Sequence, residues 1–257
     1  MPILLLFDLD GTLLRSDKTI SERTLQSLRA CREKGILIGV CTARGEKNIT
    51  AFMADLEPDL VITSGGALVK QKGECLFAAE FTLKETLHMI ETARQVCGPD
   101  VEITVDTMDK YYWNYSVDPL IDDPTWGETI YTDYAGFDQP AIKMCGEIHD
   151  PANTRKLAEH FSDCEIVKFV GNDWHKITKK GISKESAIHK ICEACHITTA
   201  DITAFGDDLV DIGMLRLCGI GVAMGNALPE VKAAANVVIG GNDEDGIAEY
   251  LNRTILS

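Results

Sequence analysis

The chain has 257 residues, of which 45% are hydrophobic and 25% are charged, as is typical of a folded globular protein. Its formal net charge of -15 disfavours nucleic acid and anionic membranes as partners, because a strongly acidic surface repels both. The sequence contains no apolar run of membrane-spanning length, and we expect no signal peptide. Its nine cysteines lack disulfide-framework spacing, so we expect reduced thiols and a cytoplasmic location.

The first predicted element is a strand over residues 3–7, an unbroken apolar run typical of a parallel strand buried on both faces. Asp8, Asp10 and Gly11 follow, where the strand should end. Ligands of open α/β sheets bind at the carboxyl ends of the strands, and a divalent cation relieves the repulsion between neighbouring carboxylates. The pattern alone fits a reactive acid pair and a simple Asp-Gly turn equally well.

Two more strands are predicted on the same pattern. A helix capped by Ser21 ends at Gly35, and the apolar strand 36–41 leads into Thr42, Ala43 and Arg44. After another helix, the strand 60–62 ends in the polar loop 63–66. Short alternating strands and helices predict a parallel sheet whose loops meet at one edge.

The pattern changes between residues 82 and 177. Helices are predicted over 82–97 and 150–161, with a loop over 118–139. Segments of alternating polarity predict half-exposed strands. These strands are expected at 101–105, 111–115, 141–148, 166–170 and 174–177. We interpret residues 82–177 as an inserted α+β domain that covers the crevice as a cap.

The parallel pattern resumes with a helix that Ser183 caps and a strand over 202–205. Acidic residues again crowd the end of a strand, at Asp207, Asp208 and Asp211. The predicted fold is α/β, with a doubly wound, mostly parallel, Rossmann-like core sheet built from residues 1–81 and 178–257.

Four motifs in this order resemble those of haloacid dehalogenase (HAD) superfamily phosphatases. They are FDLDGTLL at 7–14, TAR at 42–44, GISK at 181–184 and GDD at 206–208 with Asp211. Residues 223–227 and 242–246 resemble the C-terminal signatures of the Cof-type subgroup. The inserted segment matches the C2-type cap of that subgroup in position and pattern only.

The resemblance implies a role for each matching residue. Asp8 would be the nucleophile that forms an aspartyl-phosphate, and Asp10 would protonate the leaving oxygen and later activate water. Mg²⁺ would be the cofactor, with Asp8, the backbone carbonyl of Asp10 and Asp207 as ligands and Asp211 in support. The residues implied in phosphate or substrate binding are Gly11, Thr42, Ala43, Arg44, Lys184 and Asn226.

The fourth motif departs from the Cof-type pattern at two positions. Val210 replaces a usual Asn, and Asp208 replaces a usual Gly. Asp208 is either an additional metal carboxylate or a solvent-facing side chain, and the sequence favours neither. Elsewhere, Cys192 to His196 fits a c-type haem spacing, which we attribute to chance. Aromatic side chains at 113, 115 and 174, with His175, belong either to the cap side of the pocket or to a core.

The sequence thus predicts a Mg²⁺-dependent phosphatase that acts on a small phosphorylated metabolite such as a sugar phosphate, as a monomer or weak homodimer. A phosphomutase on the same scaffold is one alternative, since it would use the same aspartate. Another is a non-catalytic protein that binds phosphorylated metabolites, which Val210 makes conceivable.

Overall fold

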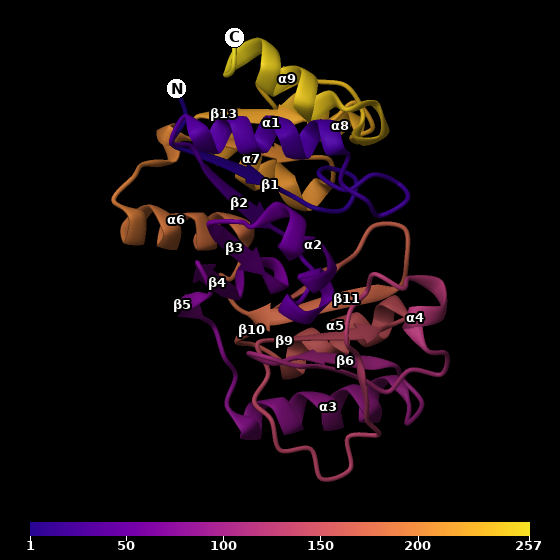
Figure 1. Ribbon diagram of the computed structural model, residues 1–257. Helices are drawn as coiled ribbons and strands as arrows, with labels where there is room; N and C mark the ends of the chain where they lie inside the picture. Colours follow the sequence, from indigo (N-terminus) through magenta and orange to yellow (C-terminus); the bar gives the residue numbers. More distant parts are fainter. The chain divides into compact units, whose positions relative to one another are not determined.

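The computed structural model describes the backbone of residues 1–257 and every side chain except that of residue 122. The chain divides into two compact units (Figure 1). Unit 1 comprises Met1–Ala43, Phe52–Phe77 and Ser183–Ser257, and unit 2 comprises Arg44–Ala51 and Ala78–Ile182. The segment Arg44–Ala51 therefore groups with unit 2, whereas the predicted core contained it. The assignment of catalytic and cap roles to two domains stays a prediction.

Unit 1 contains an eight-stranded sheet in the order β14-β13-β12-β1-β2-β3-β4-β5. The six strands from β14 to β3 are parallel, and β4 runs antiparallel to β3. The strands are β1 (Leu4–Phe7), β2 (Leu37–Cys41), β3 (Leu60–Thr63), β4 (Leu68–Gln71), β5 (Glu74–Ala78), β12 (Ile202–Gly206), β13 (Ile220–Ala223) and β14 (Val237–Val238).

Helices cover the parallel strands on both faces, since all four residues of β1 are fully buried. The helices of unit 1 are α1 (Glu22–Glu33), α2 (Thr50–Leu56), α6 (Lys184–Cys195), α7 (Ile212–Leu217), α8 (Pro229–Ala234) and α9 (Gly246–Thr254). Helices α1 and α9 lie side by side although they come from opposite ends of the chain (Figure 1). The predicted doubly wound α/β fold is confirmed. The strands β4 and β5 are additions that the sequence pattern does not predict.

The register of the central strands brings three chain segments to one edge of the sheet. Phe7 pairs with Phe205 of β12 on one side and with Val40 of β2 on the other. The rings of Phe7 and Phe205 stack with centroids 4.5 Å apart. Because these strands are parallel, the residues that follow them, including Asp8 and Asp207, emerge at the same edge.

Unit 2 contains a six-stranded sheet in the order β10-β11-β9-β6-β7-β8. Its elements are α3 (Leu83–Cys97), β6 (Ile103–Asp106), β7 (Tyr111–Trp113), α4 (Pro119–Asp122), β8 (Ile130–Tyr131), β9 (Lys143–Glu147), α5 (Pro151–His160), β10 (Cys164–Lys168) and β11 (Trp174–Lys179). Neighbouring strands are antiparallel except for the parallel pair β7 and β8. The predicted α+β organisation of this part is confirmed, although the predicted loop 118–139 contains α4 and β8.

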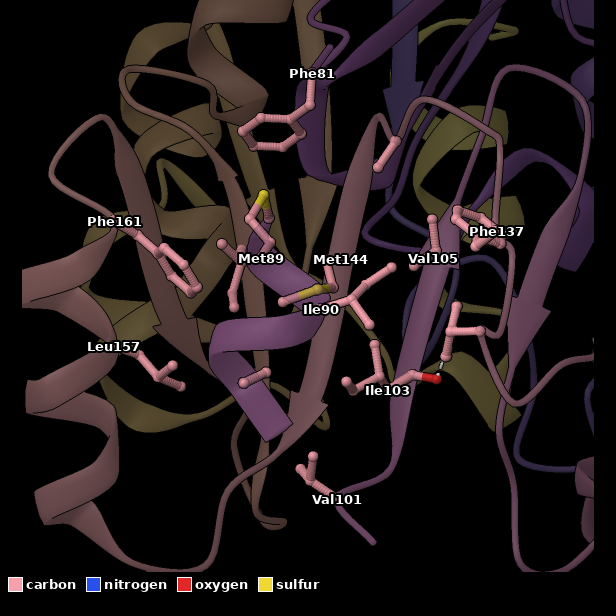
Figure 2. Packing of buried hydrophobic residues seen from close by; sticks show 14 of the residues in the cluster. Phe81, Met89, Ile90, Val101, Ile103, Val105, Phe137, Met144, Leu157 and Phe161 are labelled. Atoms are coloured by element: carbon pink, nitrogen blue, oxygen red, sulfur yellow. Dashed lines mark hydrogen bonds between the residues drawn. The ribbon is translucent and has the colours of Figure 1, made fainter. Parts of the chain in front are cut away.

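A hydrophobic core joins α3 and α5 to the sheet of unit 2. One cluster of buried side chains contains Met89 and Ile90 of α3, Leu157 of α5, and Ile103 and Val105 of β6 (Figure 2). These side chains alternate along β6 with the polar residues Thr104 and Asp106, which are also buried, so the prediction of a half-exposed strand is wrong for β6. The alternating pattern in the sequence thus reflects a sheet that helices cover on one face.

Removal of the Phe205 ring should weaken the packing that aligns β1 with β12. We expect Phe205→Ala to lower the free energy of unfolding by about 3 to 5 kcal/mol, because it removes a buried aromatic side chain and leaves a cavity. Urea unfolding followed by circular dichroism measures this. Val238→Ala, at a half-exposed strand position, is the control and should cost less than about 1 kcal/mol. Equal losses in the two variants would contradict the assignment of Phe205 to the core.

Candidate active site

A buried ion-pair network lies at the carboxyl edge of the unit 1 sheet. Asp8 follows β1 directly, and its N–H donates to the carbonyl oxygen of Phe205 at 3.0 Å. Lys184 is the first residue of α6, which Ser183 caps. The Lys184 Nζ donates to Asp8 Oδ1 at 2.6 Å and to Asp211 Oδ1 at 2.7 Å. With Lys184 only 4% exposed, these bonds form in a region where charges need partners.

Asp211 connects Lys184 to the loop after β12. This side chain is fully buried, and its Oδ2 accepts hydrogen bonds from the backbone N–H groups of Asp207 at 3.0 Å and Asp208 at 3.1 Å. Its other oxygen binds Lys184. Asp211 therefore fixes the loop that carries Asp207 against the start of α6.

Three carboxylates converge at this point. Asp8, Asp207 and Asp211 each place an oxygen within 4.8 Å of the others. When all three are ionised, their three negative charges and the positive charge of Lys184 leave a net charge of −2. Carboxylate oxygens are the ligands that hard divalent cations prefer, so this group fits a Mg²⁺ ion in both charge and chemistry.

Burial dominates the proton equilibria of the acids. It raises the pKa of Asp8 well above the ordinary value, against the opposing effect of Lys184. Burial likewise raises the pKa of Asp207 to about 6, although the hydrogen bond from Thr12 works in the other direction. For Lys184, burial acts to lower the pKa, but Asp211 and Asp8 outweigh it and hold the pKa well above the usual value. The lysine stays protonated, and bound positive charge would favour ionised aspartates.

The loop after Asp10 approaches Asp207 closely. Thr12 Oγ1 donates to Asp207 Oδ1 at 2.7 Å. Gly11 has φ of +78°, and a Cβ at this position would lie 2.3 Å from Asp207 Oδ2. Both the left-handed backbone and the close approach therefore require glycine here.

The carboxylates of Asp10 and Asp208 lie outside the acidic group, whereas the metal ligand expected from Asp10 is its backbone carbonyl. Asp10 Oδ1 accepts from Lys18 Nζ at 2.8 Å. Asp208 Oδ1 accepts from the N–H of Leu209 at 2.6 Å and caps the turn Leu209–Asp211. Asp208 thus caps a turn, and the acidic group contains Asp211 rather than Asp208, so a role of Asp208 as an additional metal ligand stays a prediction.

The second predicted motif spans the boundary between the units. Thr42 is buried in unit 1, where its N–H donates to Ile62 and its carbonyl accepts from Gly65. Ala43 is the last residue of this part of unit 1. Arg44 belongs to unit 2.

Within unit 2, Arg44 lies in an aromatic and acidic setting. Its guanidinium stacks 4.9 Å from the ring centroid of Trp126 and lies 3.5 Å from an oxygen of Asp123. It also donates to the carbonyl of Asn48 at 3.1 Å. The sequence pattern at 42–44 does not reveal Trp126 and Asp123 as partners, because they come from a distant loop.

Asn226 has a structural setting that the prediction of a phosphate ligand did not include. Its Nδ2 donates to the carbonyl of Gly11 at 2.8 Å, and its Oδ1 accepts from the N–H of Asn242 at 3.1 Å. Sequence reasoning also missed Thr12 and Lys18 as neighbours of the acids. Thr12 lies in the first motif and Lys18 shortly after it, but nothing in their spacing indicates their partners.

Two other features of the sequence remain, the Cys-His spacing at 192–196 and the aromatic residues of unit 2. Cys192 and Cys195 are free thiols in α6, and His196 ends that helix in a left-handed conformation. In unit 2, Trp113 Nε1 donates to Glu102 and its ring packs edge-on against Trp174. The position of Cys192 and Cys195 within α6 fits the interpretation of the Cys-His spacing as a chance match.

Comparison with known proteins agrees with this geometry. The family model for haloacid dehalogenase-like hydrolases matches residues 5–251. The chain belongs to this family. The predicted superfamily and the predicted enzyme class, a HAD-type phosphatase, are confirmed.

Characterised relatives align over nearly the whole chain. A 5-amino-6-(5-phospho-D-ribitylamino)uracil phosphatase of Bacillus subtilis (strain 168) is 28% identical, with 97% of this chain and 96% of the relative covered. A pyridoxal phosphate phosphatase of Escherichia coli (strain K12) is 27% identical, with 95% of each chain covered. A solved HAD subclass IIB sugar phosphatase is 27% identical with a TM-score of 0.81, over 97% of this chain and 98% of the other.

Across the described residues, each helix is too short or too polar to cross a lipid bilayer.

Gly11→Ala should disturb the acidic group more than an equivalent change elsewhere. The new Cβ would collide with the Asp207 carboxylate, so we expect a loss of Mg²⁺ affinity, measured by isothermal titration calorimetry. Gly35→Ala is the matched control, because Gly35 has φ of +81° but open space around its Cβ position. Both variants should lose about 1 kcal/mol or more of stability from backbone strain. Equal Mg²⁺ affinities in the two variants would show that the contact between Gly11 and Asp207 is unimportant.

The raised pKa of Asp207 predicts a pH dependence of stability in metal-free protein. Between its ordinary value of 3.8 and about 6, folded protein holds a proton that unfolded protein has released. This contribution is fully present below the unfolded pKa and is lost as the pH rises through about 6. The free energy of unfolding is measured by urea unfolding in the presence of a chelator. As the pH rises towards about 6, it should fall more steeply in the parent protein than in Asp207→Asn. Identical slopes would contradict the raised pKa.

Proposed function

We propose that this phosphatase hydrolyses a small phosphorylated metabolite, such as a sugar phosphate, through a phosphoryl group transferred to Asp8. The contact of Lys184 with both Asp8 and Asp211 carries this proposal. The hydrogen bond from Lys184 holds Asp8 Oδ1 in place. The single positive charge of Lys184 leaves the three ionised acids with a net negative charge. That arrangement suits a nucleophile whose charge must be controlled before it attacks phosphorus.

The reaction divides into two displacements. Asp8 attacks phosphorus and forms an aspartyl-phosphate, while Asp10 donates a proton to the leaving oxygen. Asp10 then takes a proton from water, which attacks the phosphorus and releases inorganic phosphate. Lys184 and Thr42 would bind the oxygens of the phosphoryl group, and this role for Lys184 offsets the unfavourable position of a cation at a helix N-terminus.

Mg²⁺ is the proposed cofactor, held by Asp8 and Asp207 with Asp211 close to them. When bound, it would neutralise negative charge on the transferring phosphoryl group. Val210 does not prevent the three acids from converging, so the unusual fourth motif is compatible with catalysis.

The relatives suggest the class of substrate. By their names, the aligned relatives are a phosphatase for a phosphoribitylaminouracil, a phosphatase for pyridoxal phosphate and a sugar phosphatase. Pyridoxal phosphate and the ribitylaminouracil phosphate are monoesters of organic alcohols. We therefore propose an alkyl phosphate monoester as substrate here, with a leaving oxygen that needs the proton of Asp10.

Asp8→Asn should lower kcat at least about a thousandfold while the fold is retained, because an amide is a far poorer nucleophile than a carboxylate. The measurement is phosphate release from a panel of phosphorylated metabolites, with Mg²⁺ and with chelator, alongside circular dichroism. Asp201→Asn, which changes a capping acid of a remote turn, is the control and should retain activity. Near-parental turnover by Asp8→Asn would rule out Asp8 as the nucleophile. Full activity of the parent protein in the presence of a chelator would rule out a requirement for Mg²⁺.

A further inference from the structure

The segment after Asp10, here called loop 11–18, touches two acids of the candidate site. Thr12 donates to Asp207, and Lys18 donates to Asp10. Lys18 itself has a left-handed backbone with φ of +63°, which is uncommon for a residue with a side chain. The position of this loop therefore affects both the proposed proton carrier and a proposed metal ligand.

Two asparagines from C-terminal loops hold one side of loop 11–18. Asn226 donates to the carbonyl of Gly11 at 2.8 Å and accepts from the N–H of Asn242 at 3.1 Å. Asn242 in turn donates through Nδ2 to the carbonyl of Leu14 at 2.9 Å. The two amides thus connect three separate segments of unit 1.

Two aspartates of the same C-terminal segment hold the next residues of the loop. Asp243 accepts from the N–H of Ser16 at 2.9 Å and from its Oγ at 2.6 Å. Asp245 Oδ1 accepts from the guanidinium of Arg15 at 2.6 Å. The bonds from Ser16 also lower the pKa of Asp243, so this acid stays ionised near neutral pH.

We infer that Asn226, Asn242, Asp243 and Asp245 form a clamp that positions loop 11–18, and through it Asp10, for proton transfer. They are positioning residues, and Asn226 acts through Gly11 rather than as a phosphate ligand. This inference rests on the proposed function, since it assigns the clamp to the step in which Asp10 protonates the leaving oxygen.

The clamp has a consequence that depends on the leaving group. The alkoxide of an alkyl phosphate is a poor leaving group and needs the proton of Asp10, whereas p-nitrophenolate leaves readily without it. Loss of the clamp should therefore lower kcat/KM, which covers the steps up to departure of the leaving group, far more for glycerol phosphate than for p-nitrophenyl phosphate. The later attack of water also uses Asp10, but it is common to both esters and does not enter kcat/KM. A general loss of folded protein would slow both reactions by the same factor.

The test compares Asp243→Ala and Asn226→Ala with the parent on both esters. The control is Asp201→Ala, because Asp201 accepts from the N–H and Oγ of Thr198 just as Asp243 accepts from Ser16, but in a remote turn. We expect kcat/KM for glycerol phosphate to fall about tenfold or more in the clamp variants, and kcat/KM for p-nitrophenyl phosphate by less than about threefold. Asp243→Asn keeps an acceptor oxygen for Ser16 and should restore most of the lost kcat/KM for glycerol phosphate.

Inhibition by inorganic phosphate separates the clamp from direct phosphate binding. The inhibition constant should stay unchanged in Asn226→Ala if Asn226 acts through Gly11, and a large rise would overturn the inference. An equal loss of kcat/KM on the two esters, or a loss no greater than in Asp201→Ala, would also overturn it. If the parent releases phosphate from neither ester under any Mg²⁺ concentration, the proposed function fails and the clamp fails with it.

Discussion

The buried ammonium group of Lys184, held between Asp8 and Asp211, is the interaction on which the candidate site depends. Buried carboxylates are unfavourable unless positive charge or hydrogen bonds compensate them. Lys184 compensates part of the charge of the three converging acids. Asp211, which Lys184 holds, accepts two backbone hydrogen bonds from the loop that carries Asp207 and so fixes the position of that loop. The charge that remains uncompensated gives the site its proposed affinity for a divalent cation.

The sheet makes this cluster possible. Stacking of Phe7 on Phe205 fixes neighbouring parallel strands in a register that brings their following residues to one edge. Close approach then needs glycine at two positions. A Cβ on Gly11 would meet Asp207, and a Cβ on Gly66, with φ of +106°, would lie 2.1 Å from the carbonyl oxygen of Ser183. Gly66 thus lets the loop after β3 pack against the start of α6, where Lys184 begins the helix.

Much of this organisation is predictable from local patterns. Unbroken apolar runs identify the parallel strands, and the order of the motifs predicts that Asp8, Lys184 and Asp207 lie at one edge of the sheet. The hairpin strands β4 and β5 escape prediction because each has only a short apolar run, with polar residues at one end. The cap formed by Asp208, the pairing of Lys18 with Asp10 and the setting of Arg44 against Trp126 also escape it. Each of these depends on side-chain geometry or on contacts between distant segments, which spacing in the sequence does not encode.

The central claim of the account is that the phosphoryl group passes through Asp8. Borohydride reduction tests it most directly, because this reagent converts an acyl phosphate to an alcohol that mass spectrometry detects. Protein mixed with a hydrolysed phosphate ester and Mg²⁺, then quenched into borohydride, should carry the reduced side chain at position 8. Parallel samples without the ester should not. Release of phosphate with position 8 unmodified, or with the modification on another residue, would contradict the account.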